Sequence, residues 1–222
     1  MPEDHYFSAA PAGPDSRRPL RVRLDGEAVE LESAPGVFSG ERLDPGTAVL
    51  LDVVPGPPAE GDLLDLGCGW GPLALTMARR SPRARVWAVD VNERARQVTS
   101  ANAARLGLDG VRAVAPDDVP DDVHLAALWS NPPIRVGKAA LHELLERWLP
   151  RLAPDGTAHL VVQKNLGSDS LQRWLAEQPW AQRFSVERAH SARGYRVLRL
   201  TPSGGPGGGA GAPGGAAGPR GA

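Results

Sequence analysis

The sequence is poor in cysteine, in aromatic residues and in long apolar runs. Cys68 is the only cysteine among 222 residues, which excludes an internal disulfide framework and a zinc site built from several cysteines. This usage fits a reducing compartment. No apolar run reaches the length of a membrane span or of a signal-peptide core, so we expect a soluble, cytoplasmic protein without a bound metal.

Net charge is also small, a formal −1, but the two signs are unevenly distributed. Residues 1–134 carry 13 basic and 20 acidic side chains, whereas residues 135–222 carry 12 and 6. A polyanionic partner would favour surface built from the later part of the chain. Ordinary charge scatter explains the same numbers equally well.

Composition divides the chain into three regions. Residues 1–60 form an N-terminal extension, in which alternation around Asp25-Gly26 predicts a β-hairpin and Ala48–Val54 predicts a short helix. Residues 61–202 alternate apolar and amphipathic segments and form the main domain. Residues 203–222 contain almost only Gly, Pro and Ala, which predicts a disordered tail.

The alternation of apolar and amphipathic segments in the main domain predicts an α/β fold, with a doubly wound, Rossmann-like sheet of seven mostly parallel strands. Its last two apolar runs are separated by a short link containing Gly194 and by no helix, so one C-terminal strand is expected to be antiparallel. The expected strands are 62–66, 85–90, 111–115, 125–129, 158–163, 184–189 and 195–200. The expected helices are 73–80, 93–106, 138–152 and 170–177.

The stretch Asp65-Leu-Gly-Cys-Gly-Trp-Gly71 joins the first of these strands to a helix. Glycines at alternate positions let the backbone approach a bound molecule closely, and the N-terminus of the next helix offers unpaired N–H groups and a positive dipole. The dinucleotide-binding spacing fails, because Pro72 stands in the place of its last glycine. The turn predicts a ligand, with Cys68 as a small packing residue rather than a nucleophile.

Acidic residues follow the next two strands. Asp90 closes the second strand, where its carboxylate can accept both hydrogen bonds from a ribose diol. A solvated or helix-capping aspartate is the alternative, although Asn92 already predicts the N-cap of the following helix. Asp117 and Asp118 lie beyond the third strand and can accept from the amine of an adenine, or simply belong to a solvated acidic loop.

The stretch Asn131-Pro-Pro-Ile134 directly follows the fourth strand and so lies at the same carboxyl edge of the sheet. Each proline lacks an N–H group and forces the residue before it out of helical geometry. This predicts a rigid, extended corner whose carbonyls have few internal partners. Together with the Asn131 amide oxygen, these acceptors can hold an NH₂ group and direct its nitrogen outward, as alkylation of a weakly nucleophilic amine requires. A plain strand terminator is the alternative.

Together these motifs resemble the class I S-adenosylmethionine-dependent methyltransferases, in particular the branch of bacterial small-subunit ribosomal RNA guanine-N2 methyltransferases and their single-domain relatives. The stretches Gly36-Val-Phe-Ser39, Asp44-Pro-Gly-Thr47 and Gly194-Tyr-Arg-Val-Leu198 are also similar to that branch. The resemblance implies an N-methyltransferase that acts on an exocyclic amine, namely guanine N2 of 16S ribosomal RNA. It also implies S-adenosyl-L-methionine as the cofactor and ribosomal RNA or the small ribosomal subunit as the partner.

The resemblance further implies roles for individual residues, with the target amine on the corner formed by Asn131, Pro132, Pro133 and Ile134. In the family an aromatic residue and a histidine usually follow the prolines, where this chain has Ile134 and Arg135. Ile134 can press on a base face, and Arg135 can stack on a base or contact phosphate. The residues implied to bind the cofactor are Asp65, Gly67, Cys68, Gly69, Gly71, Asp90, Val91, Asn92, Asp117, Asp118 and Asn131. Those expected to contact phosphate are Arg135, Lys138, Lys164, Arg193 and Arg196.

Other activities use the same corner. Methylation of a glutamine amide in a protein, or of adenine in DNA or transfer RNA, is an alternative, although those relatives usually have an aromatic residue at the position of Ile134. A cofactor-binding interaction module that has lost catalysis is an alternative from another class. The intact Asn131 argues against this module.

Overall fold

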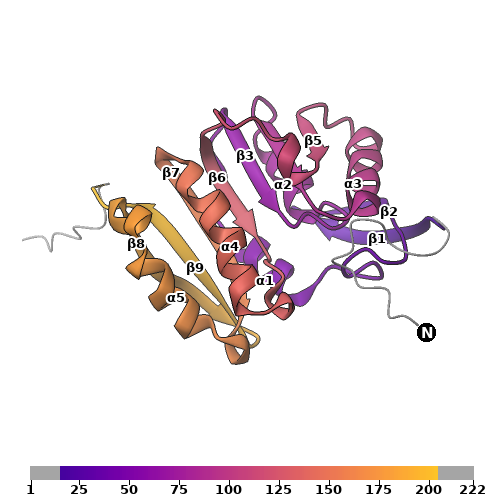
Figure 1. The fold of residues 1–222 in the computed structure, drawn as a ribbon. Helices are drawn as coiled ribbons and strands as arrows, with labels where there is room; N and C mark the ends of the chain where they lie inside the picture. The colour runs from indigo at the N-terminus through magenta and orange to yellow at the C-terminus, as the bar shows by residue number, and fades with distance from the viewer. Residues whose placement is uncertain (1–15, 205–222) are drawn as a thin grey trace, which may run out of the picture.

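The computed structural model describes residues 16–204, without the side chain of Arg135 (Figure 1). The tail predicted to be disordered lies outside these residues from position 205 onward. The described chain forms a two-stranded sheet and a seven-stranded sheet with helices on both faces. Within residues 16–204, no helix has both the length and the apolar character needed to cross a membrane.

The seven-stranded sheet has the strand order β5-β4-β3-β6-β7-β9-β8. Strand β9 runs antiparallel to both of its neighbours, and the other paired strands are parallel. The predicted fold class, a doubly wound sheet with one antiparallel C-terminal strand, is therefore confirmed. The strands are β3 (Asp62–Leu66), β4 (Arg85–Val89), β5 (Val111–Val114), β6 (Leu125–Ser130), β7 (Leu152–Gln163), β8 (Phe184–Ala192) and β9 (Tyr195–Pro202).

Side chains alternate along each strand and so supply two apolar layers. Leu63 and Trp129 point to the layer that contains α1, α2 and α3, whereas Leu64 and Leu128 point to the layer that contains α4 and α5. The helices are α1 (Pro45–Val53), α2 (Pro72–Arg80), α3 (Glu93–Arg105), α4 (Lys138–Trp148) and α5 (Ser168–Glu177). Short 3₁₀ helices are η1 (Pro116–Asp118), η2 (Ile134–Val136), η3 (Leu149–Arg151), η4 (Lys164–Leu166) and η5 (Pro179–Arg183).

The N-terminal hairpin consists of β1 (Arg18–Leu24) and β2 (Glu27–Ser33), as the sequence predicts. Leu24 and Leu31 are fully buried in the same layer as α2 and α3. The Asn102 side chain of α3 accepts from the Glu32 N–H at 2.8 Å and donates to the Glu32 carbonyl at 2.9 Å. The hairpin thus docks on α3 and directs the next segment, Gly36–Ser39, over the carboxyl edge of the sheet.

Several predicted boundaries differ in the structure, and the three largest shifts at the start of an element or at the end of a helix involve a proline or glycine. Strands β8 and β9 also extend to residues 192 and 202 rather than 189 and 200, and α5 begins at residue 168 rather than 170. Helix α1 begins at Pro45 rather than at residue 48, because proline is well suited to the first helical position. Helix α4 ends at Trp148 rather than at residue 152, because Pro150 has no N–H group with which to continue it. Strand β7 begins at Leu152 rather than at residue 158, with a register shift in its pairing with β6. Gly156 lies within that irregularity, where a Cβ would come 2.5 Å from the Leu125 carbonyl oxygen.

Candidate functional site

The site lies where the order of the parallel strands reverses. Strands β3 and β6 are neighbours, yet the chain continues from β3 to one side of the sheet and from β6 to the other. In open α/β sheets such a switch point leaves a crevice at the carboxyl ends of the strands. Leu66 and Ser130 are paired at these ends, and the Ser130 hydroxyl donates to the Leu66 carbonyl at 2.6 Å. The glycine turn and the Asn131 corner therefore start side by side.

The glycine turn is held by strand β4. The Gly67 and Cys68 N–H groups both donate to the Val89 carbonyl, at 2.8 and 3.1 Å. Gly67 has φ +80°, and a Cβ there would meet no atom within 4 Å, so the backbone is open to a ligand. Burial raises the pKa of the Cys68 thiol well above its usual range, and the nearby Asp90 and Asp65 charges add to this. Cys68 is thus unsuited to act as a nucleophile.

Gly71 carries a steric requirement that can be tested. Its φ is +97°, and a Cβ would lie 3.0 Å from Thr99 Cγ2 and 3.1 Å from Thr99 Oγ1. We expect Gly71→Ala to lower the free energy of unfolding by about 2–4 kcal/mol, since backbone strain and crowding both act. Gly26→Ala is the matched control, because Gly26 has φ +82° and open space around it, and it should cost only about 1–2 kcal/mol. Urea denaturation measures both, and equal losses would contradict the steric explanation.

Asp65 is completely buried at the end of β3 and lines a cavity of about 10 Å³ with Gly67 and Gly69. Its Oδ2 accepts from the Ala74 N–H at 2.9 Å, at the N-terminus of α2. Its Oδ1 has no hydrogen-bond partner among the residues described. Burial raises the pKa of Asp65 to about 8, and the Asp90 charge adds to the rise. The unpaired oxygen is an acceptor for a ligand that brings its own donors, above all a cation.

Asp90 is 7% exposed and holds the backbone of both neighbouring loops. One oxygen accepts from the Gly69 N–H at 3.0 Å and the other from the Asn92 N–H at 2.9 Å. Each carboxylate oxygen has a second lone pair for a ligand hydroxyl. Burial raises the pKa of Asp90, and these hydrogen bonds oppose the rise. Val91, directly after it, is 44% exposed and offers an apolar face.

The two remaining acidic candidates are engaged elsewhere. The Asp117 carboxylate accepts from Arg147 of α4 at 2.8 Å. The Asp118 carboxylate accepts from the Ala115 N–H at 3.2 Å and closes the 3₁₀ turn η1.

Asn92 caps α3 as predicted, since its Oδ1 accepts from the Arg94 N–H at 2.9 Å. Its Nδ2 donates to the Gly36 carbonyl at 2.7 Å, which ties the N-terminal segment to the site.

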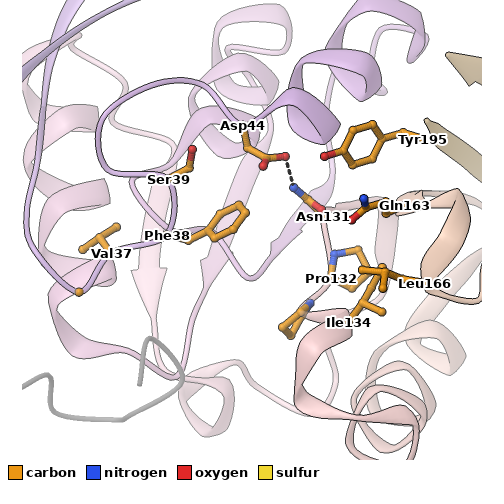
Figure 2. Close-up of a pocket in the computed structure, with 12 residues that line it drawn as sticks. Val37, Phe38, Ser39, Asp44, Asn131, Pro132, Ile134, Gln163, Leu166 and Tyr195 are labelled. Carbon is orange, nitrogen blue, oxygen red and sulfur yellow. Dashed lines mark hydrogen bonds between the residues drawn. The ribbon is translucent and has the colours of Figure 1, made fainter. Parts of the chain in front are cut away.

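The amide of Asn131 is oriented by residues of the N-terminal extension. Its Nδ2 donates to Asp44 Oδ1 at 2.7 Å (Figure 2). The same Nδ2 donates to Thr47 Oγ1 at 3.0 Å. With the amide nitrogen engaged by these acceptors, the amide oxygen is the group left for a ligand.

The expectation that the proline carbonyls have few internal partners is wrong. The Pro132 carbonyl accepts from the Ile134 N–H at 2.8 Å and the Pro133 carbonyl from the Val136 N–H at 3.2 Å, because the chain turns immediately into η2.

A cavity of about 430 Å³ opens beside Asn131. Figure 2 shows Phe38 of the N-terminal segment on one side, with Ile134 and Leu166 on the other. Its volume lies in the range of small-molecule sites. Phe38, Asp44 and Asn131 also line the smaller cavity at the glycine turn, so the two cavities adjoin. The lining residues are Gly36, Val37, Phe38, Ser39, Asp44, Asn131, Pro132, Pro133, Ile134, Gln163, Leu166 and Tyr195.

The basic candidates fall into two groups. Lys138 begins α4 and Lys164 begins η4, and both are exposed close in sequence to cavity residues. Arg193 is exposed and lies 3.7 Å from Asp52. Arg196 is only 8% exposed, and its guanidinium donates to Ser168 Oγ at 3.1 Å and also to Asp169. Arg196 therefore has internal partners, whereas the side chain of Arg135 lies outside the described structure.

The sequence-based prediction of site residues included no residue of the N-terminal extension and omitted Tyr195 of β9. Asp44, Phe38 and Tyr195 all line the cavity, although each belongs to a stretch that had only marked the resemblance. The signal for Asp44 was a local one, an aspartate before Pro45 that predicts a helix N-cap. Its Oδ1 does accept from the Gly46 and Thr47 N–H groups, at 2.8 and 3.0 Å. The sequence around Asp44 does not predict that the same oxygen also accepts a hydrogen bond from Asn131.

Known proteins resemble the chain in sequence and in fold. The family model named methyltransferase small domain matches residues 28–199. The uncharacterised protein YbxB of Bacillus subtilis is 33% identical over 177 residues, which cover 78% of this chain and 88% of that protein. The ribosomal RNA small subunit methyltransferase C of Pseudomonas aeruginosa is 40% identical over 167 residues, which cover 71% of this chain and 49% of that protein.

Solved structures show the same architecture. The 16S rRNA N2 methyltransferase RsmC of T. thermophilus, in complex with AdoMet and guanosine, matches with a TM-score of 0.71 and 24% identity. The match covers 86% of this chain and 52% of that chain, and it shows a shared fold. The chain thus spans about half the length of the ribosomal RNA small subunit methyltransferase C relatives that it matches.

Proposed function

The chain belongs to the methyltransferase small domain family, and from this we propose that it is an S-adenosylmethionine-dependent N-methyltransferase acting on guanine N2 of 16S ribosomal RNA. The single observation that carries the proposal is the orientation of Asn131, whose amide nitrogen is held by Asp44 and Thr47 at the edge of a cavity that adjoins the glycine turn. The names of the relatives support the choice of acceptor. Such an enzyme would act in the cytoplasm, where bacterial ribosomes are assembled.

The cofactor proposal is supported by the chemistry of the donor set. S-adenosylmethionine supplies a methyl group on a positively charged sulfur. Asp65 Oδ1 is a buried acceptor with no hydrogen-bond partner among residues 16–204, which suits the ammonium group of the methionine part. The open backbone at Gly67 and the lone pairs of Asp90 suit a close approach and the ribose hydroxyls. The exposed Val91 suits the adenine, with Asn92 beside it, whereas Asp117 and Asp118 have other partners.

The acceptor proposal follows from the walls of the larger cavity. A guanine that leaves its stack needs apolar surface on both faces and hydrogen-bond partners at its edge. Phe38 lies on one side of the cavity and Ile134 on the other, so Phe38 can supply the aromatic face that the corner itself lacks. Asn131 Oδ1 accepts from the N2 amine at the edge. Lys138, Lys164 and Arg193, with Arg135, are proposed to contact the phosphates around the flipped nucleotide.

These residues act chiefly by placing the reactants. S-adenosylmethionine would supply the methyl group: the amine lone pair would form the new N–C bond while the S–C bond broke and left its electron pair on sulfur. The nitrogen, then cationic, would lose a proton to water, so no basic side chain is required. Orientation of this kind contributes up to about 7–11 kcal/mol to a rate enhancement.

Cofactor affinity should depend on pH through Asp65. Burial raises the pKa of this carboxyl to about 8 in the free protein, so it is neutral at pH 7 and must lose its proton to pair with an ammonium group. We expect affinity to rise about tenfold per pH unit between pH 6 and about pH 8, with release of up to one proton on binding. Calorimetry in buffers of different ionisation enthalpy measures both quantities. Affinity that is constant over this range would contradict the proposed role of Asp65.

Transfer of a tritiated methyl group identifies the acceptor. The wild-type protein is incubated with labelled S-adenosylmethionine and, separately, with small ribosomal subunits, naked 16S RNA, DNA and a protein release factor. We expect label in guanine N2 of the RNA. Label in the protein or the DNA alone would overturn the RNA assignment, and measurable cofactor binding without any transfer would favour the interaction module.

A further inference from the structure

Asp44 makes more contacts than a helix cap requires. A single oxygen of its carboxylate, Oδ1, accepts from the Gly46 N–H, the Thr47 N–H and Asn131 Nδ2. The first two bonds cap α1, but the third crosses 87 residues to the end of β6. In the described part of the chain, no hydrogen bond reaches Oδ2, although Asp44 lines both cavities. The carboxylate thus lies between the turn and the corner of the site.

The geometry decides which way the Asn131 amide faces. An amide can present either its NH₂ group or its oxygen to a ligand, and rotation by a half-turn exchanges the two. Asp44 Oδ1 and Thr47 Oγ1 both take Nδ2, and a carboxylate cannot donate to the amide oxygen in its place. A half-turn would therefore set the Asn131 oxygen against a negatively charged oxygen. The charge of Asp44 disfavours that arrangement and leaves Oδ1 of Asn131 for the acceptor amine.

The same charge acts during the transfer. The acceptor nitrogen becomes positive as the N–C bond forms, and a carboxylate joined to it through one amide group stabilises that charge. A hydrogen bond to an ionised acceptor is also about twice as strong as a neutral one, so it polarises the amide and makes its oxygen a better acceptor. The Asp44–Asn131 bond is already present in the free protein. The interaction of the Asp44 charge with the acceptor nitrogen strengthens as positive charge develops there, so it lowers the barrier more than it tightens binding.

We propose that Asp44 is a positioning residue of the methyl-transfer site, whose carboxylate holds the Asn131 amide with its oxygen toward the acceptor amine and stabilises the positive charge formed there. This inference rests on the proposed function. It assigns to the N-terminal extension a direct part in the reaction, because α1 and its cap provide the carboxylate.

Two variants separate this role from helix capping. Asparagine is as good an N-cap as aspartate, so Asp44→Asn should melt at the wild-type temperature. Because it lacks the charge, its kcat should fall about tenfold, the difference between a charged and a neutral hydrogen bond. Asp44→Ala removes the cap and the hydrogen bond, and its kcat should fall about 100-fold, the scale of a misplaced reacting group. Cofactor Kd should stay near the wild-type value in both variants. Wild-type kcat in Asp44→Asn would overturn the proposal.

A double-mutant cycle shows whether Asp44 acts through Asn131. In an Asn131→Ala background the Asp44→Ala change should lower kcat by much less than 100-fold, since the group that it positions is gone and only the direct attraction of its charge remains. Losses that multiply would overturn the proposal. The cycle is run on whichever acceptor the wild-type protein labels, so that transfer to protein or DNA would refute the RNA assignment and still test Asp44.

A spectroscopic measurement tests the contact even without turnover. In ¹⁵N-labelled protein, the side-chain amide protons of Asn131 should exchange slowly with water, because Asp44 and Thr47 hold them. Exchange should become faster in Asp44→Ala and change little in Thr47→Val, where the stronger partner remains. An unchanged signal in Asp44→Ala would overturn the proposal, whatever the acceptor.

Discussion

Replacing Asn131 by alanine is expected to lower kcat for methyl transfer about 100- to 1,000-fold, which is the scale of losing one oriented polar group in an active site. In the proposed mechanism this substitution removes the amide oxygen that accepts from the acceptor amine, in an amide whose Nδ2 donates to Asp44 and Thr47. Cofactor affinity should fall by at most about tenfold, the worth of one hydrogen bond. Single-turnover transfer of a labelled methyl group and calorimetry measure the two quantities separately.

Asn165→Ala is the matched control for this variant. Asn165 lies in η4, is exposed, and undergoes the same chemical change as Asn131→Ala. Its kcat and its melting temperature should equal those of the wild-type protein. If Asn131→Ala keeps more than about a tenth of the wild-type kcat, loss of this oxygen is no larger than loss of an ordinary hydrogen bond, and the proposed role of the corner is wrong.

Asp65→Asn is expected to weaken cofactor binding about 10- to 100-fold, the range for a hydrogen bond to a charged group. The variant keeps a side-chain oxygen for the Ala74 N–H but turns an NH₂ group toward the proposed position of the cofactor's ammonium group. It should also abolish the rise of affinity between pH 6 and pH 8. Asp62→Asn, in the same strand, is the control, because Asp62 accepts from Trp87 Nε1 and does not line the cavity at the glycine turn.

The raised pKa of Asp65 also predicts the direction in which Asp65→Asn changes the free energy of unfolding. The folded pKa of Asp65, about 8, lies above its unfolded value of 3.8, so the wild-type protein loses stability as pH rises from about 4 to about 8. The variant has no such group and should lose less stability over this range. The free variant should therefore be at least as stable as the wild-type protein at pH 8 in urea denaturation. A variant that is both less stable and unchanged in cofactor affinity would show that Asp65 is structural only.

The sequence determined the parts of the molecule that depend on local periodicity and on backbone chemistry. Alternating and amphipathic segments are local properties, so they predicted the seven-stranded sheet and its antiparallel strand. The glycines from Gly67 to Gly71 and the prolines after Asn131 restrict φ at their own positions, so they predicted two special turns at one edge of the sheet. The boundaries at Pro45, Pro150 and Gly156 were misjudged because side-chain pattern outweighed backbone chemistry there.

Only the tertiary structure showed which side chains from distant parts of the chain lie beside these two turns. The bond between Asp44 and Asn131 joins positions 87 residues apart, and no periodicity in the sequence encodes it. The same holds for Phe38, which reaches the cavity because the hairpin docks on α3, and for Arg196, whose charge is taken up by Asp169. Local sequence restricts the torsions of each segment, whereas the partner of a polar side chain depends on how those segments pack.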